Sequence, residues 1–84
     1  MQAYIALIRL DRDGTFLVEF PDFPECTTAG ETLRHARLLA EATLAAHLDG
    51  LRKAGVEIPE PSCLKDIRQH DPATAEVMSL LVAV

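Results

Sequence analysis

The sequence predicts an α+β domain in which an antiparallel sheet carries one long helix on one face, in the order β-β-β-α-(short α)-β. Three observations lead to this prediction. Two strand-like segments flank an Asp-Gly turn, a long stretch repeats apolar residues at helical spacing, and the last residues form a short valine-rich run. The 84 residues suffice for a single domain spanning residues 1–84.

The first two strands are predicted over residues 4–10 and 15–20. The first segment is apolar except for Arg9, and the second places Phe16, Val18 and Phe20 on one face. The residues between them, Asp-Arg-Asp-Gly, accept the dihedral angles of a tight turn. The two segments therefore form an antiparallel hairpin.

Two prolines interrupt the chain directly after the second strand. Because proline fixes φ and lacks an amide donor, residues 20–24 are predicted to form a rigid extended loop and not a regular central strand. Residues 25–29 follow as a short third strand, which Gly30 ends.

The clearest element is a helix predicted over residues 32–53. Thr32 is a suitable N-cap, and Gly55 follows the last turn as a stop signal. Its apolar stripe consists of Leu33, Ala36, Ala40, Leu44, His47 and Leu51, broadened by Leu39 and Leu48.

The C-terminal third is predicted to contain a stiff connector, a short helix and a strand. Residues 58–61 hold two prolines, and Ser62 caps a helix from residue 63 to about 70 that buries Leu64 and Ile67. An Asp-Pro pair at 71–72 stops it. Residues 77–84 are predicted as a strand, with a helix as the alternative, because the run is short and rich in valine.

Apolar residues occur on both faces of the first and last strands, which predicts self-association. A single helix layer covers one face of a sheet, and a solvated second face normally alternates apolar with polar residues. We therefore expect a homodimer or homotetramer. The expected contact residues are Ile5, Leu7, Leu17 and Leu81.

The net charge of −5 indicates which kind of partner the chain can bind. Nucleic-acid binding needs a basic surface, so no direct nucleic-acid contact is expected, whereas a basic protein suits this chain. Acidity that only keeps a small domain soluble is the alternative. The sequence has only two cysteines, and it shows neither a signal peptide nor an apolar run long enough to span a membrane. We therefore expect a cytoplasmic protein with reduced thiols and no membrane contact.

No catalytic, cofactor or metal site is expected. The chain lacks a phosphate loop and a nucleophile elbow, and Cys26 and Cys63 are expected to be structural. The carboxylates around the hairpin, Asp11, Asp13, Glu19 and Asp22, leave a two-metal nuclease as a minor alternative. The turn location of the first two carboxylates argues against it.

Three stretches resemble the N-terminal domain of HicB antitoxins. They are the first strand with its Asp-x-Asp-Gly turn, the segment Glu-Phe-Pro-Asp-Phe-Pro-Glu-Cys-Thr-Thr-Ala-Gly-Glu-Thr-Leu at residues 19–33, and residues 47–62. The resemblance covers nearly the whole chain. Glu25 departs from it, because the family usually has glycine there, and Arg34 and His35 stand at positions often acidic in the family.

The resemblance implies a truncated RNase H-like fold and a type II toxin–antitoxin system. The implied partner is a small basic HicA-type mRNA interferase whose RNA-binding surface the antitoxin masks. Most members add a C-terminal ribbon-helix-helix or helix-turn-helix DNA-binding segment, and this chain is expected to be a short form without one. An orphan or structural oligomer without a toxin is the alternative. The expected partner-binding residues are Phe20, Pro21, Asp22, Phe23, Pro24 and Glu25.

Overall fold

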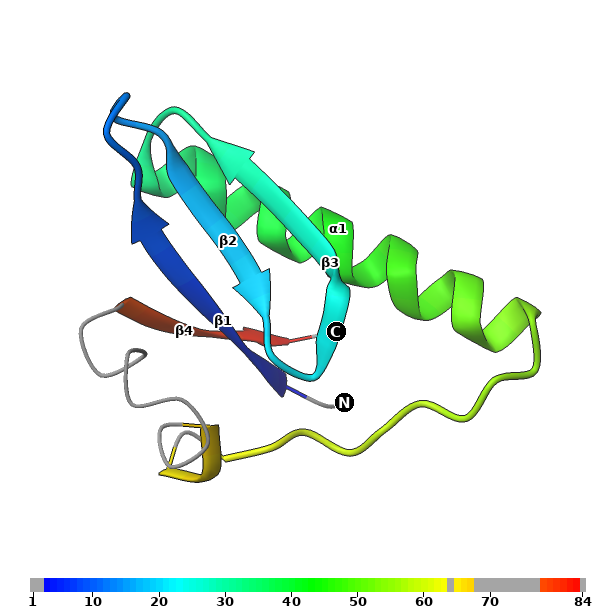
Figure 1. Cartoon of the computed structure of the whole chain (residues 1–84). Coiled ribbons are helices and arrows are strands. Elements are labelled where there is room, and N and C mark those ends of the chain that lie inside the picture. Colours follow the sequence, from blue (N-terminus) through cyan, green and yellow to red (C-terminus); the bar gives the residue numbers. More distant parts are fainter. Residues whose placement is uncertain (1–2, 64, 68–77, 84) are drawn as a thin grey trace.

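The computed structural model, which describes residues 3–63, 65–67 and 78–83, contains a four-stranded antiparallel sheet and one long helix (Figure 1). The strands are β1 (Ala3–Leu10), β2 (Phe16–Phe20), β3 (Phe23–Gly30) and β4 (Met78–Ala83), and the helix is α1 (Leu33–Lys53). Their order in the sheet is β3-β2-β1-β4. The predicted fold class and the predicted terminal strand are confirmed, although residues 77 and 84 lie outside the described part.

The β1–β2 turn forms where the Asp-Gly signal predicts it. Asp11 N donates to Thr15 O at 2.7 Å, and Gly14 N donates to Asp11 O at 3.1 Å. Gly14 has a φ of +83°, in the left-handed region that favours glycine. The second strand begins one residue later than predicted, at Phe16.

The prediction of a loop over residues 20–24 was wrong in its extent. Phe20 ends β2, as the predicted second strand has it, but β3 begins at Phe23, two residues before the predicted third strand. Phe20 pairs with Phe23, so only Pro21 and Asp22 form the turn. Pro24 lies inside β3, which is an edge strand. Proline is tolerated in an edge strand because its missing N–H can face away from the neighbouring strand.

Helix α1 begins and ends as predicted. Thr32 Oγ1 accepts a hydrogen bond from His35 N at 3.0 Å, and Gly55 has a φ of +72° directly after the helix. The buried stripe consists of Ala36, Ala40, Leu44 and Leu48. Two expectations need correction: Leu33 is 45% exposed, whereas Leu48, expected at the margin of the stripe, is 1% exposed.

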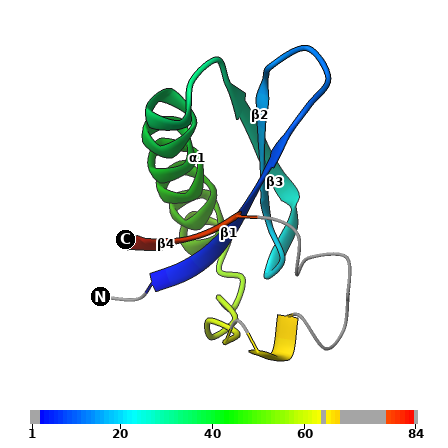
Figure 2. The same ribbon diagram turned by 90° about the vertical axis from the view of Figure 1, so that its left-hand side faces the viewer.

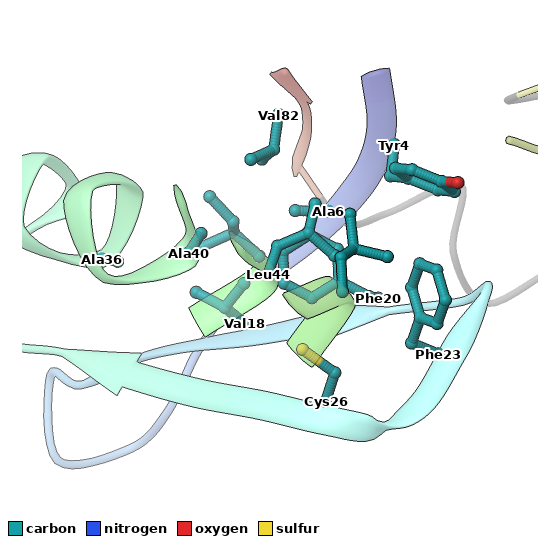
Figure 3. Packing of buried hydrophobic residues seen from close by; sticks show 12 residues of the cluster. Tyr4, Ala6, Val18, Phe20, Phe23, Cys26, Ala36, Ala40, Leu44 and Val82 are labelled. Carbon is teal, nitrogen blue, oxygen red and sulfur yellow. The ribbon is translucent and has the colours of Figure 1, made fainter. Parts of the chain in front are cut away.

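The main core lies between α1 and the helix-facing side of the sheet (Figure 3). Tyr4 and Phe23 come together from β1 and β3 with ring centroids 5.0 Å apart. Gly30 allows a close approach of β3 to the helix, since a Cβ there would lie 2.5 Å from Ala36 N. Burial of large apolar side chains between the two layers supplies most of the stabilisation.

The second face of the sheet is covered in part by the chain itself. Ile5 and Leu7 are only 7% and 3% exposed and pack with Ile67. Residues 65–67 are helical and lie on the side of the sheet away from α1 (Figure 2). Cys63, where the predicted short helix was expected to begin, is not helical, and residues 64 and 68–70 of that prediction lie outside the described residues.

Candidate functional site

The connector after α1 is fastened to the sheet at two points. Tyr4 Oη donates a hydrogen bond to Pro59 O at 2.6 Å. At the β2–β3 turn, Asp22 accepts two hydrogen bonds from Ser62, one from the backbone N at 3.0 Å and one from Oγ at 2.6 Å. These contacts carry the chain from the end of the helix to the second face of the sheet.

A groove of about 750 Å³ lies between the second face of the sheet and this fastened segment. Register places its strand residues on the side away from α1, because Leu7 pairs with Glu19 and Glu19 pairs with Thr27. The described residues that line it are Leu7, Arg9, Glu19, Phe20, Pro21, Asp22, Pro24, Thr27, Ser62, Asp66 and Ile67.

The lining of this groove is acidic. It contributes the carboxylates of Glu19, Asp22 and Asp66 and the guanidinium of Arg9. Arg9 Nε lies 3.8 Å from Glu19 Oε2, and both side chains are more than a third exposed, so this pair is a weak surface interaction. Asp66 is exposed. The groove therefore presents an excess of negative charge above an apolar floor.

The residues that were expected to bind a partner differ in how far they are accessible at the surface. Phe20 and Phe23 are 1% and 3% exposed, so both are core residues. Pro21 and Asp22 are half-buried, and Pro24 is exposed. These three residues line the groove together with Phe20.

Glu25 is directed elsewhere. It is exposed, and its Oε1 lies 3.0 Å from His47 Nε2 of α1, a distance typical of an ion pair but without hydrogen-bond geometry. The His47 ring also packs edge-on against Phe23, with centroids 5.2 Å apart. Glu25 thus links β3 to the helix and does not line the groove.

The expected self-association residues also differ in accessibility. Leu17 and Leu81 are 37% and 68% exposed, whereas Ile5 and Leu7 are buried within the chain. The two leucines remain available for a contact with another molecule.

Sequence reasoning missed the role of Asp66 and Ser62 in the groove. They come from the segment after the helix, whose position against the β2–β3 turn is set by long-range contacts. The signal in the sequence was the stiff run of residues 58–61 followed by a polar residue.

Burial changes the acidity of two core groups. Desolvation raises the pKa of Tyr4 above its ordinary value, and the carboxylates of Asp22 and Glu60 add to the rise, while Arg52 opposes it. Desolvation, with the negative charge of Glu25, also raises the pKa of the Cys26 thiol. Both groups are therefore neutral around pH 7, and Cys26 is poorly suited to act as a thiolate nucleophile.

The hairpin carboxylates do not converge. Asp11 and Asp13 lie in the β1–β2 turn, whereas Asp22 lies at the opposite end of β2. Within residues 3–63, 65–67 and 78–83, no group of three metal-ligating side chains is found. In the same part of the chain, no helix has both the length and the apolar character needed to cross a bilayer.

Comparison with known proteins adds a family match. Residues 4–84 match the model of the HicB_like antitoxin of bacterial toxin-antitoxin systems. The UPF0150 protein Ta0767 of Thermoplasma acidophilum is 32% identical over 67 residues, covering 80% of this chain and 96% of that protein. A 14.9 kDa protein of Haemophilus phage HP1 is 35% identical over 57 residues, and the match spans 42% of its length.

Several solved structures resemble nearly the whole chain. The N-terminal domain of the Burkholderia pseudomallei antitoxin HicB has a TM-score of 0.85 at 20% identity, with 99% of this chain and 98% of that domain covered. This likeness shows the fold. A chain of a HicA3–HicB3 toxin–antitoxin complex has a TM-score of 0.74 at 27% identity, with 98% and 96% covered.

Proposed function

Because the chain belongs to the HicB_like antitoxin family of bacterial toxin–antitoxin systems, we propose that its acidic groove binds a small basic HicA-type toxin and covers the toxin's RNA-binding surface. The antitoxin role follows from the family. The toxin and the groove as its docking site are the proposal.

One observation carries the choice of the groove. Among the described residues that line the groove, the three carboxylates of Glu19, Asp22 and Asp66 face one cation, Arg9, which already neighbours Glu19. The surface with which a toxin binds RNA carries basic side chains, and these would lie opposite the carboxylates of the groove. Such complementary charge raises the association rate and disfavours wrong partners. The two hydrogen bonds from Ser62 to Asp22 hold the segment that forms one wall, so the groove is pre-organised.

Charge reversal tests this assignment. We expect Asp66→Lys and Glu19→Lys each to weaken toxin binding by about tenfold or more, equivalent to about 1.4 kcal/mol, in calorimetric titrations. Asp13→Lys is the matched control. It changes the net charge equally, but it lies in the exposed β1–β2 turn at the far end of β2. Raising the salt concentration should reduce the difference between the groove variants and wild type.

Three outcomes are informative. Weakening by the groove variants alone supports docking at the groove. Equal weakening by Asp13→Lys would mean that only the overall charge matters, and the groove assignment would fail. If the wild-type chain binds no HicA-type protein, the chain is an orphan or structural member of the family.

We also propose that the chain works as a cytoplasmic binding module without enzymatic activity and that it self-associates. Cys26 and Cys63 are both free thiols, which suits a reducing compartment. The exposed Leu17 and Leu81 supply apolar surface for self-association. The relationship of the sheet to the RNase H fold stays a prediction from the family resemblance.

A further inference from the structure

The two edges of the sheet are protected very differently. β3 carries Pro24 and Glu25, both of which discourage another strand from pairing with it. β4 forms the other edge and reads Met-Ser-Leu-Leu-Val-Ala, with no charge and no proline. An apolar edge strand without these devices is a template for pairing.

Apolar side chains are exposed on both sides of β4. Leu81 pairs with Ile5 and so points to the face away from α1, where it is 68% exposed. On the helix side, Met78 and Leu33 are each 45% exposed. They line a hollow of about 490 Å³ together with Ile8, Arg34, Arg37, Ser79 and Leu80.

We propose that β4 pairs with β4 of a second copy of this chain, antiparallel and about a two-fold axis, to form a continuous eight-stranded sheet. This inference locates the self-association proposed above, and it does not depend on toxin binding. A strand that pairs with itself about a two-fold axis forms an isologous interface, the commonest kind in homodimers.

The sequence of β4 is self-complementary in this arrangement. Directly opposed residues of an antiparallel pair lie on the same face of the sheet. The axis therefore passes beside one residue that pairs with its own copy, and the two central residues, Leu80 and Leu81, give the longest overlap of the two strands. The first register opposes Met78 with Val82 and Ser79 with Leu81, and the second opposes Leu80 with Val82 and Ser79 with Ala83. Neither register places a charge opposite a like charge.

Charge favours a second copy over an unrelated basic protein at this edge. The chain carries a net charge of −5, yet none of that charge lies in β4. The neighbouring helix surface mixes signs, with Arg37 Nε 3.8 Å from Glu41 Oε1 and Arg34 one turn earlier. Two copies can therefore pair along β4 without opposing like charges within the strand. A domain of this size also gains most from extra apolar burial.

The test is the solution mass of the full chain, measured by light scattering after size exclusion. Wild type should have at least twice the 9.2 kDa of one chain. Leu81→Lys should halve that mass at the same concentration, because it places a charge on the paired edge. Leu17→Lys is the matched control on the same face, in β2 and away from the edge, and it should leave the mass unchanged.

Several results would overturn the proposal. These are a monomeric wild type, an unchanged mass for Leu81→Lys, or a mass halved by Leu17→Lys. Circular dichroism verifies that each variant folds, and Ser79→Lys, at an exposed position of the same strand, replaces Leu81→Lys if that variant unfolds. A monomeric Leu81→Lys that still binds the toxin would separate this inference from the docking proposal.

Discussion

The contact between Asp22 and Ser62 should stabilise the domain as well as shape the groove. Asp22→Ala removes the acceptor of two hydrogen bonds, of 3.0 Å from Ser62 N and 2.6 Å from Ser62 Oγ. Hydrogen bonds to charged groups contribute about 1.5–3 kcal/mol each when buried. Both residues are half-buried, so water replaces part of the interaction, and we expect a total loss of about 1–2 kcal/mol.

Urea unfolding followed by circular dichroism measures this loss. With an m value of about 1–2 kcal/mol per molar for so small a domain, the midpoint should fall by about 1 M without a change in slope. All variants need the same protein concentration, because self-association would otherwise shift the apparent stability.

A double-mutant cycle assigns the loss to the pair. Ser62→Ala removes the hydroxyl donor and keeps the backbone N–H, so the cycle isolates the 2.6 Å hydrogen bond. The coupling free energy between Asp22→Ala and Ser62→Ala should be about 1 kcal/mol. Additivity to within about 0.3 kcal/mol would refute the claim that these side chains fasten the connector.

Three further predictions concern the core. Leu44→Ala, at a fully buried position of α1, should lower the free energy of unfolding by about 2–5 kcal/mol in thermal or urea unfolding. Gly30→Ala in β3 should destabilise the fold strongly, because the new Cβ would lie 2.5 Å from the backbone N of Ala36 in α1. Gly50→Ala is the control within α1, where a Cβ meets open space, and it should stabilise the fold by about 0.5–1 kcal/mol. Similar effects at both sites would contradict the close contact between β3 and α1. Folding raises the pKa values of Tyr4 and Cys26, so their contribution to the free energy of unfolding should be constant at neutral pH and should fall as the pH rises above about 9–10. Tyr4→Phe should make this fall in the free energy of unfolding less steep. An unchanged pH profile would show that Tyr4 contributes nothing to the pH dependence.

Local signals predicted most of the fold because the relevant physics is local. The Asp-Gly turn, the Thr32 cap and the stop at Gly55 are each decided by a few neighbouring residues, and all three occur as predicted. The terminal strand was also predicted correctly, from its length and its β-branched residues.

The start of β3 was predicted wrongly because it depends on the position of the strand in the sheet, which the local sequence does not reveal. Pro24 forbids a central strand, but it does not forbid an edge strand, and the position of β3 in the sheet depends on the whole topology. The same limit applies to Phe20 and Phe23. Their motif marks the β2–β3 turn correctly, yet their side chains complete the core, and only Pro21, Asp22 and Pro24 of that motif present surface to the groove.

The second face shows how a long-range contact changes an interface prediction. Ile5 and Leu7 look exposed when the sheet is considered alone, because α1 covers the other face. The connector brings Ile67 over them, held by the contacts of Tyr4 and Asp22. The apolar surface that remains is displaced toward Leu81 and the β4 edge.

The central claim is that this chain neutralises a basic RNA-cleaving toxin by occupying its RNA-binding surface. The most direct measurement is RNA cleavage by the cognate HicA-type protein as a function of added antitoxin, with wild type compared with the double variant Glu19→Lys, Asp66→Lys. We predict that wild type abolishes cleavage at a stoichiometric ratio and that the folded double variant requires a large excess. Full inhibition by the double variant at the wild-type ratio would contradict docking at the groove, and cleavage unaffected by wild type would contradict the antitoxin account itself.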